Sequence, residues 1–229
     1  MQSKFDAVVT ATLVVCALIT TGLVVRREMR GSPESTVGPV AAKSPVWLPD
    51  WHNYLDRGER IGSTGASVQL VEFADFECPF CGTFHQTMKE VRARYPSQVA
   101  LTFVHFPLPM HRFAIPAARV AECARNQGHF EAMHDQLFEG QDHFGLKPWV
   151  DYATAAAVPD MTEFDACVKN TNPIPRVEEG KALGAKLDVH GTPTVIINGW
   201  KLEHPPSEQE LEKMVQRVLA GKQPVDGKS

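Results

Sequence analysis

The sequence predicts an α/β protein preceded by one N-terminal membrane-spanning helix. Residues 7–25 form an uncharged run, and residues 46–229 show the order strand, helix, strand, a block of helices, two strands and a closing helix. With 43% hydrophobic and 22% charged residues, the chain can bury a core. Its 23 Lys and Arg against 27 Asp and Glu give a net charge of −4. No basic run appears, so we expect no nucleic-acid partner.

The N-terminal run has the length of a bilayer core. At ~1.5 Å per residue, residues 7–25 extend about 28 Å in a helix. Arg26 and Arg27 follow directly, and the nearest small-residue cleavage site lies at 40–42. We therefore expect residues 1–30 to be an uncleaved signal anchor rather than a cleaved signal peptide. Residues 31–45, with eight Gly, Pro or Ser, predict a flexible tether.

The elements of the body follow from hydrophobic periodicity. Residues 68–76 form an apolar run without Gly or Pro and predict a buried strand. Apolar residues then recur at steps of three or four from Phe80 to Tyr95, so one face of a helix is predicted, with Pro79 in its first turn. The other expected elements are a strand at 99–106, helices at 115–126, 129–139, 147–157, 160–169 and 174–187, strands at 194–198 and 200–202 joined by an Asn198-Gly199 turn, and a final helix opened by a capping box of Ser207 and Glu210.

Two cysteines at the start of the first predicted helix carry the chemistry. Cys78 and Cys81 are three residues apart, so one helical turn brings them to the same side. Cys78 meets the unpaired N–H groups of the helix start, which stabilise its thiolate and make it the expected nucleophile. Cys81, one turn further in, is the expected resolving thiol. Half a zinc site with His85 as third ligand is the alternative, but no second pair of ligands follows at zinc spacing.

Three segments carry a family resemblance. VEFADFECPFCGTFH resembles the active-site segment of DsbA-like thiol-disulfide oxidoreductases of the thioredoxin superfamily, the segment at 105–141 resembles their helical insertion, and GTPTVIING resembles their cis-proline strand. The resemblance covers about residues 60–220 in the same motif order. It implies a thioredoxin fold over residues 46–229, with a helical domain of about residues 107–187 inserted between the second and third strands.

The resemblance also assigns roles to residues. It places Cys78 and Cys81 at the redox pair, Pro193 at the cis-proline that faces it, and Glu72 at a buried acid that assists proton movement at the resolving cysteine. An exposed strand carboxylate is the alternative for Glu72. Thr192, before the proline, would present its backbone to an extended substrate.

Further substrate contacts are expected from the two residues between the cysteines, Pro79 and Phe80. DsbA itself has histidine at the position of Phe80. A phenylalanine cannot donate a hydrogen bond to the thiolate, so an extremely oxidising potential does not follow from the resemblance. No cofactor is expected beyond the cysteine pair.

The remaining cysteines of the body lie on apolar helical stripes. Cys123 and Cys167 are therefore either two buried thiols or, as some DsbA-like relatives imply, a structural disulfide within the insertion, which we favour in an oxidising compartment. The histidines at 105, 111, 129 and 134 are expected to be surface or packing residues because their spacing matches no metal motif. Trp47, Trp51 and Tyr54 are expected to pack, with a membrane-interface belt as the alternative.

Together these features predict a membrane-tethered extracytoplasmic thiol-disulfide oxidoreductase, on the periplasmic or outer side of a bacterial cell membrane. Expected partners are reduced secreted proteins and a quinone-linked membrane thiol oxidase of the DsbB-like or vitamin K epoxide reductase-like kind, with the chain itself a monomer. The alternatives are a reductase or isomerase of the same fold, a metal-delivery protein using Cys78, Cys81 and His85, and a holdase-like binding module. Arg26, Arg27 and the later Arg30 favour a cytoplasmic body by charge alone, but the redox chemistry favours export.

Overall fold

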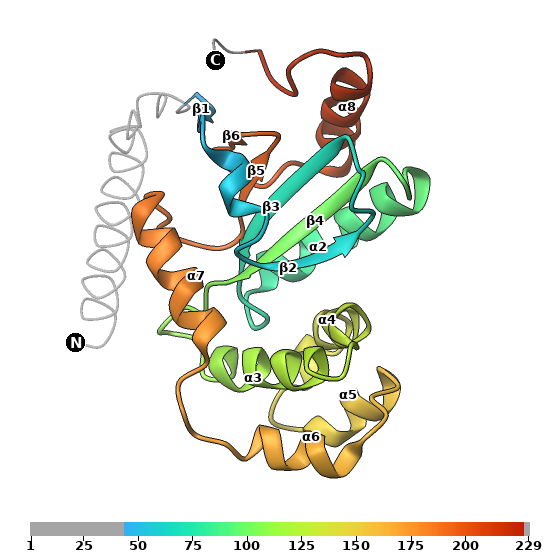
Figure 1. The fold of residues 1–229 in the computed structure, drawn as a ribbon, viewed down its shortest axis with the longest axis vertical. Coiled ribbons are helices and arrows are strands. Elements are labelled where there is room, and N and C mark those ends of the chain that lie inside the picture. Colours follow the sequence, from blue (N-terminus) through green and yellow to red (C-terminus); the bar gives the residue numbers. More distant parts are fainter. Residues whose placement is uncertain (1–43, 227–229) are drawn as a thin grey trace, which may run out of the picture. The chain divides into compact units, whose positions relative to one another are not determined.

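A computed structural model describes residues 44–226 and contains a six-stranded mixed sheet in the order β1-β6-β5-β3-β4-β2 (Figure 1). The strands are β1 (Val46–Trp47), β2 (Glu59–Gly62), β3 (Val68–Ala74), β4 (Val99–His105), β5 (Thr194–Ile197) and β6 (Trp200–Lys201). The anchor predicted at 7–25 and nearly all of the predicted tether lie outside the described residues. Within residues 44–226, no helix has the length and apolar character needed to cross a membrane.

The central strands form two units that the sequence predicts. β3 and β4 run parallel and are joined by α2 (Pro79–Arg94), while β5 and β6 form an antiparallel hairpin. Asn198 and Gly199 occupy the hairpin turn with φ of 43° and 87°, the left-handed region that Asn-Gly pairs favour in such turns. The short edge strands β1 and β2 were not predicted from the sequence, because two to four residues carry too little periodicity to reveal a strand.

Helices cover both faces of the sheet. β3 sends Val68 and Leu70 into the core shared with α2 and α8 (Glu208–Leu219), and it sends Val71 and Phe73 into a second cluster on the opposite face. That second face is covered by the 3-10 turn η1 (Trp51–Tyr54) and by α7 (Pro175–Lys186). Successive side chains of β3 therefore belong alternately to two hydrophobic cores, one on each face of the sheet.

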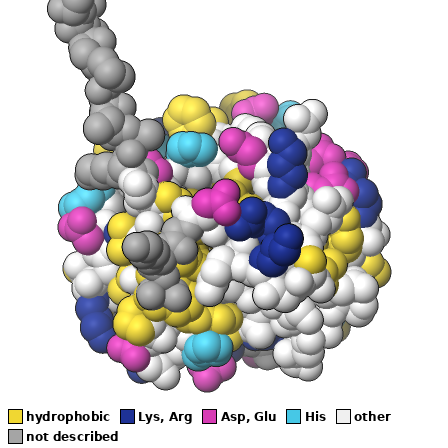
Figure 2. Space-filling model, turned by 90° about the horizontal axis from the view of Figure 1, so that it is seen from above, with side chains coloured by type: hydrophobic (Ala, Val, Ile, Leu, Met, Phe, Trp, Pro, Cys, Tyr) yellow, Lys and Arg dark blue, Asp and Glu magenta, His cyan; other side chains and the backbone are white. Residues whose placement is uncertain are grey.

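The aromatic residues near the tether belong to this packing. Trp51 and Tyr54 are buried in the second cluster, and the ring of Trp47 lies 5.4 Å from that of Trp200. The expectation that they pack is confirmed. On the face of the molecule drawn in Figure 2, acidic and basic side chains are interspersed rather than gathered by sign.

Four helices and one 3-10 turn follow β4 and lie together beyond one end of the sheet (Figure 1). They are α3 (Ala114–Arg125), α4 (Phe130–Glu139), η2 (Gln141–His143), α5 (Trp149–Ala155) and α6 (Met161–Val168). The predicted insertion of about residues 107–187 also included α7, which instead packs against the sheet, so the helices beyond the sheet end before α7. The buried imidazole of His105 at the end of β4 lies 3.0 Å from the carboxylate of Glu122 in α3, which ties the insertion to the sheet.

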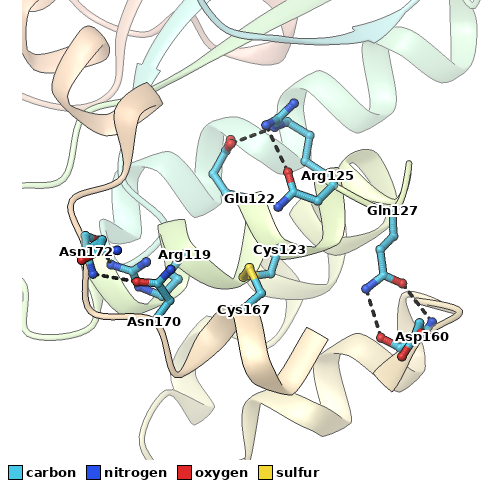
Figure 3. Close-up of a disulfide and its surroundings, with 10 residues drawn as sticks. Arg119, Glu122, Cys123, Arg125, Gln127, Asp160, Cys167, Asn170 and Asn172 are labelled. Carbon is cyan, nitrogen blue, oxygen red and sulfur yellow. Dashed lines mark hydrogen bonds and ion pairs between the residues drawn. A yellow bond between two sulfur atoms is a disulfide. The ribbon is translucent and has the colours of Figure 1, made fainter. Parts of the chain in front are cut away.

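A disulfide joins Cys123 of α3 to Cys167 of α6 (Figure 3). Polar contacts flank it: the guanidinium of Arg119 donates to the Asn172 carbonyl at 2.6 Å, and the amide of Gln127 exchanges two hydrogen bonds with the Asp160 backbone. Of the two interpretations that the sequence leaves open, the structure therefore shows the pairing.

Candidate active site

The two cysteines lie where β3 passes into α2. Cys78 is the N-cap residue of α2 and Pro79 occupies its first turn, so the Cys78 side chain meets the unpaired N–H groups of the helix. Both cysteines are free thiols and buried, with Cys78 3% exposed and Cys81 fully covered. The Cys78 thiol donates a hydrogen bond to the Thr192 carbonyl at 3.3 Å.

The two thiols differ sharply in acidity. A hydrogen bond from Cys81 lowers the pKa of Cys78 to about 5, with further contributions from the Thr192 side chain and from the backbone N–H groups of Cys81 and Phe80 that outweigh the opposing effect of burial. Burial raises the pKa of Cys81 far above its ordinary value, and the hydrogen bond to Cys78 and the charge of Glu72 add to this. At neutral pH, Cys78 is therefore the thiolate and Cys81 the thiol.

Glu72 is buried in the middle of β3. Its side chain faces the same side of the sheet as Leu70 and Ala74, the side covered by α2. The residue is 1% exposed, and within residues 44–226 its Oε1 has no hydrogen-bond partner. Burial, followed by the charge of Cys78, raises the pKa of Glu72 to about 8. The exposed alternative is thus excluded, and the carboxyl group keeps its proton at pH 7.

The proline loop lies across from the cysteines. The peptide bond between Thr192 and Pro193 is cis, and the Thr192 carbonyl faces Cys78. A groove of about 460 Å³ runs along this loop. It is lined by Val46, Asp188, His190, Gly191, Thr192, Pro193, Thr194, Lys201, Leu202 and Glu203. Two of the four predicted substrate-binding residues, Thr192 and Pro193, therefore line one groove beside the nucleophile.

The other two predicted substrate-binding residues lie outside the lining of that groove. Pro79 opens α2, and Phe80 is 69% exposed. The periodicity argument that placed Phe80 on the buried face of the helix is therefore wrong. The face holds from Phe84 onward, and Phe80 precedes it in the first turn.

Two residues that support the active-site loop escaped the sequence analysis. The Gln141 amide donates to the carbonyls of Phe76 at 2.6 Å and Cys78 at 2.9 Å. The same side chain fills the space beside Gly82, where an added Cβ would lie 2.7 Å from Gln141 Oε1. Buried Asp75 accepts from the His111 ring at 2.7 Å and from two backbone N–H groups. Both residues stood inside segments that carry the family resemblance, Asp75 in the active-site segment and Gln141 at the end of the segment at 105–141, but nothing in their local pattern indicated these contacts.

The third ligand proposed for a metal-delivery site is not oriented toward the cysteines. His85 lies one turn after Cys81 in α2, but its ring stacks on Phe138 and neighbours His134 and Asp135. Among residues 44–226, the three-residue group with metal-ligand geometry contains His85 without either cysteine.

The match to a family model decides the identity of the fold. Residues 56–217 match the model described as Thioredoxin, which is more than two thirds of the chain. The chain belongs to the thioredoxin family. The match includes both cysteines, the insertion and the cis-proline, so the predicted thioredoxin-like α/β fold with inserted helices is confirmed.

Solved structures share this fold. The oxidised BdbD of Bacillus subtilis superposes with a TM-score of 0.62 at 21% identity, over 79% of this chain and 98% of that chain. The catalytic domain of Proteus mirabilis ScsC gives 0.60 at 24% identity, over 74% and 95%, and α-DsbA1 of Wolbachia pipientis gives 0.59 at 19%, over 71% and 90%. The predicted resemblance to DsbA-like members of the thioredoxin superfamily is confirmed at the level of family and fold.

The chain also matches parts of longer curated proteins that are named as antiporters. A protein of Mycolicibacterium vanbaalenii named Na(+)/H(+) antiporter NhaA 1 is 35% identical over 153 residues, which cover 66% of this chain and 25% of that protein. An antiporter NhaA 3 of Salinispora tropica is 32% identical over 166 residues, again 25% of its length. The chain thus spans about a quarter of the length of the curated relatives it matches.

Proposed function

We propose that this protein is a membrane-tethered thiol-disulfide oxidoreductase that exchanges disulfides with secreted or membrane proteins through Cys78 and Cys81. The observation that carries the proposal is the opposite perturbation of two thiols one helical turn apart, with the pKa of Cys78 lowered to about 5 and that of Cys81 raised. Such a pair gives one attacking or leaving sulfur and one resolving sulfur.

The reaction in the oxidising direction balances on these residues. A substrate thiolate attacks the Sγ of Cys78 in the Cys78–Cys81 disulfide, and Cys81 leaves and takes up a proton. A second substrate thiolate then attacks the substrate sulfur of the mixed disulfide, and Cys78 leaves as a thiolate. The substrate dithiol loses two electrons and becomes a disulfide, while the cysteine pair gains them. Glu72, a buried carboxyl group with a pKa near neutrality, is the proposed proton donor and acceptor for Cys81.

The low pKa of Cys78 favours this direction over reduction or isomerisation. A stabilised thiolate stabilises the reduced form of the pair and makes its disulfide a stronger oxidant. During the exchange, the groove beside cis-Pro193 would hold an extended substrate segment against the Thr192 backbone. The pair needs no further cofactor, and a quinone-linked membrane thiol oxidase would restore its disulfide.

We place the catalytic body outside the cytoplasm, tethered by residues 7–25 and 31–45. The Cys123–Cys167 disulfide supports this location, because cytosolic glutathione and thioredoxin systems disfavour structural disulfides. The curated relatives are named as antiporters, but this chain spans only about a quarter of their length, so no antiport is proposed for it. Alkaline phosphatase fused after residue 229 should be active, and a silent fusion beside a fluorescent cytoplasmic reporter at the same junction would contradict the location.

Trapping the mixed disulfide tests the reaction itself. Cys81→Ala removes the resolving thiol, so this variant should accumulate protein substrates linked through Cys78 and should fail to complete oxidative refolding of a reduced protein. A variant with Cys123 and Cys167 both changed to alanine serves as the control, and it should release substrate normally while folded. Peptide mapping that finds the substrate linked through Cys81 would refute the assignment of roles.

A further inference from the structure

A cluster of ligating side chains lies between the active-site helix and the insertion. His85 comes from α2, while His134 and Asp135 come from α4. One ligand atom of each residue lies within 4.8 Å of the others, and this is the single such group of three that residues 44–226 contain. The cluster plays no part in the thiol chemistry described above.

The two imidazoles are buried and incompletely bonded. His85 is 4% exposed and His134 is 3% exposed, and neither Nε2 has a hydrogen-bond partner among the residues that the structure describes. On the opposite side of each ring, Nδ1 faces the same carboxylate oxygen of Asp135, at 3.9 Å from His85 and 3.0 Å from His134. The two Nδ1 atoms and the Asp135 carboxylate oxygen are therefore the ligand atoms that face one another in the cluster.

The protonation state suits a ligand role. Burial lowers the pKa of both imidazoles, so both rings are neutral at pH 7. A neutral ring that carries its proton on Nε2 offers the lone pair of Nδ1 to an ion, so ion binding would replace the hydrogen bond between His134 Nδ1 and Asp135. Their mutual proximity adds to this effect for His85, because two cationic rings 5.1 Å apart would repel each other. The rings are held in place by phenylalanines, with His85 stacked on Phe138 and His134 edge-on to Phe76, Phe103 and Phe138.

The surrounding charges leave the cluster with a net negative charge. Lys89 and Arg92 are the nearby cations, and each is paired, with Glu139 and with Glu131 respectively. Among residues 44–226, the carboxylate of Asp135 is within ion-pair distance of the two histidines and of no Lys or Arg. Its side chain is about one third exposed, which gives an ion a route from solvent.

We propose that His85, His134 and Asp135 form a binding site for a divalent first-row transition metal, with Zn²⁺ as the best fit. Two imidazole nitrogens and one carboxylate oxygen are ligands that Zn²⁺ prefers, and a tetrahedral ion with bonds of about 2.0–2.2 Å needs ligand atoms roughly 3.3 Å apart. The two measured separations from Asp135 Oδ1, 3.0 and 3.9 Å, lie on either side of that value. Three protein ligands would leave a fourth position for water.

Binding would connect two parts of the molecule. His85 follows Cys81 by one turn of α2, about 6 Å along the helix, while its two co-ligands belong to the insertion. A bound ion would therefore link the active-site helix to α4 and stabilise their contact. We expect added Zn²⁺ to raise the melting temperature of the protein by mass action.

Titration of the full-length chain tests the proposal. Cys16, Cys78 and Cys81 are changed to Ala, Ser and Ser so that thiolates cannot bind the ion, and ZnCl2 is added under calorimetric observation at pH 7.5. We expect one equivalent bound with a Kd of about 10 µM or tighter, and a cobalt(II) complex with tetrahedral d–d absorption and no sulfur charge-transfer band.

Variants identify the ligands. His85→Phe and His134→Phe keep an aromatic ring in the packing, and Asp135→Asn keeps the shape at a partly exposed position, so each should fold and weaken Zn²⁺ binding at least about tenfold. His143→Phe, an exposed histidine outside the cluster, should bind as the parent does. A Kd weaker than about 10 µM in the parent, or unchanged affinity in folded Asp135→Asn and either histidine variant, would overturn the proposal.

Discussion

Replacing Cys81 by alanine should raise the pKa of Cys78. The hydrogen bond from Cys81 is the largest cause of the low Cys78 pKa, ahead of the contacts from Thr192 and the helix N–H groups. The remaining contacts stay in place in Cys81→Ala, so the Cys78 pKa should settle between about 5 and the ordinary value of 9.0. This measurement tests why Cys78 is more acidic than Cys81, separately from the trapping of substrates.

The low pKa of Cys78 sets the size of this effect. A Cys78 pKa of about 5 instead of 9.0 leaves the thiol ionised at pH 7, two pH units above its midpoint. At ~1.36 kcal/mol per unit, the thiolate stabilises the reduced form at pH 7 by up to about 2.7 kcal/mol, or about 60 mV in reduction potential. Because the folded pKa is lowered, this contribution is complete above pH 9 and disappears as the pH falls through 5.

Ultraviolet thiolate absorbance against pH measures the midpoint directly. Cys16→Ala serves as the background, since Cys123 and Cys167 are disulfide-bonded and do not titrate. The reduced protein should show a single step near pH 5 and the Cys81→Ala variant a step at higher pH. A step above pH 8 in the reduced background protein, or the same midpoint with and without Cys81, would refute the reasoning.

Three further results are expected. Replacing Cys123 and Cys167 by alanine opens a loop with a sequence separation of 44 and should cost roughly 4 kcal/mol in urea unfolding, whereas a loss below about 1 kcal/mol would show that the flanking contacts suffice. Gly180→Ala would place a Cβ 2.1 Å from a backbone carbonyl oxygen of β4 and should cost about 1–3 kcal/mol or more. The Cβ of Gly65→Ala would lie 4.0 Å from the Ser63 hydroxyl oxygen and should change stability little. Because the pKa of Glu72 is raised in the folded state, the stability contributed by its protonated form is complete below pH 4.5 and is lost as the pH rises to about 8. The unfolding free energy of Glu72→Gln should therefore rise by up to about 3 kcal/mol relative to that of the wild type between pH 4.5 and 7. The same difference in unfolding free energy between variant and wild type at both pH values would contradict this.

The sequence by itself determined the order of the main elements and the chemistry of the site. The apolar run of β3, the helical period after Pro79 and the Asn198-Gly199 turn are local signals, and each produced the element expected. The capping box of Ser207 and Glu210 opens α8 as predicted. Two cysteines at a helix start predict a redox pair, because one turn of helix sets their separation, and the resemblance of the surrounding segment to DsbA-like proteins favours this over half a zinc site.

Only the tertiary structure decided which side chains come together across the chain. The burial of Glu72 depends on α2 covering one face of β3, and the bonds of Gln141 to the active-site loop join residues more than 60 positions apart. His85 meets His134 and Asp135 because α4 packs on α2, a contact that no local periodicity encodes. Spacing reports neighbours within one helix or strand, whereas the environment that sets a pKa or assembles a ligand set is made by residues distant in sequence.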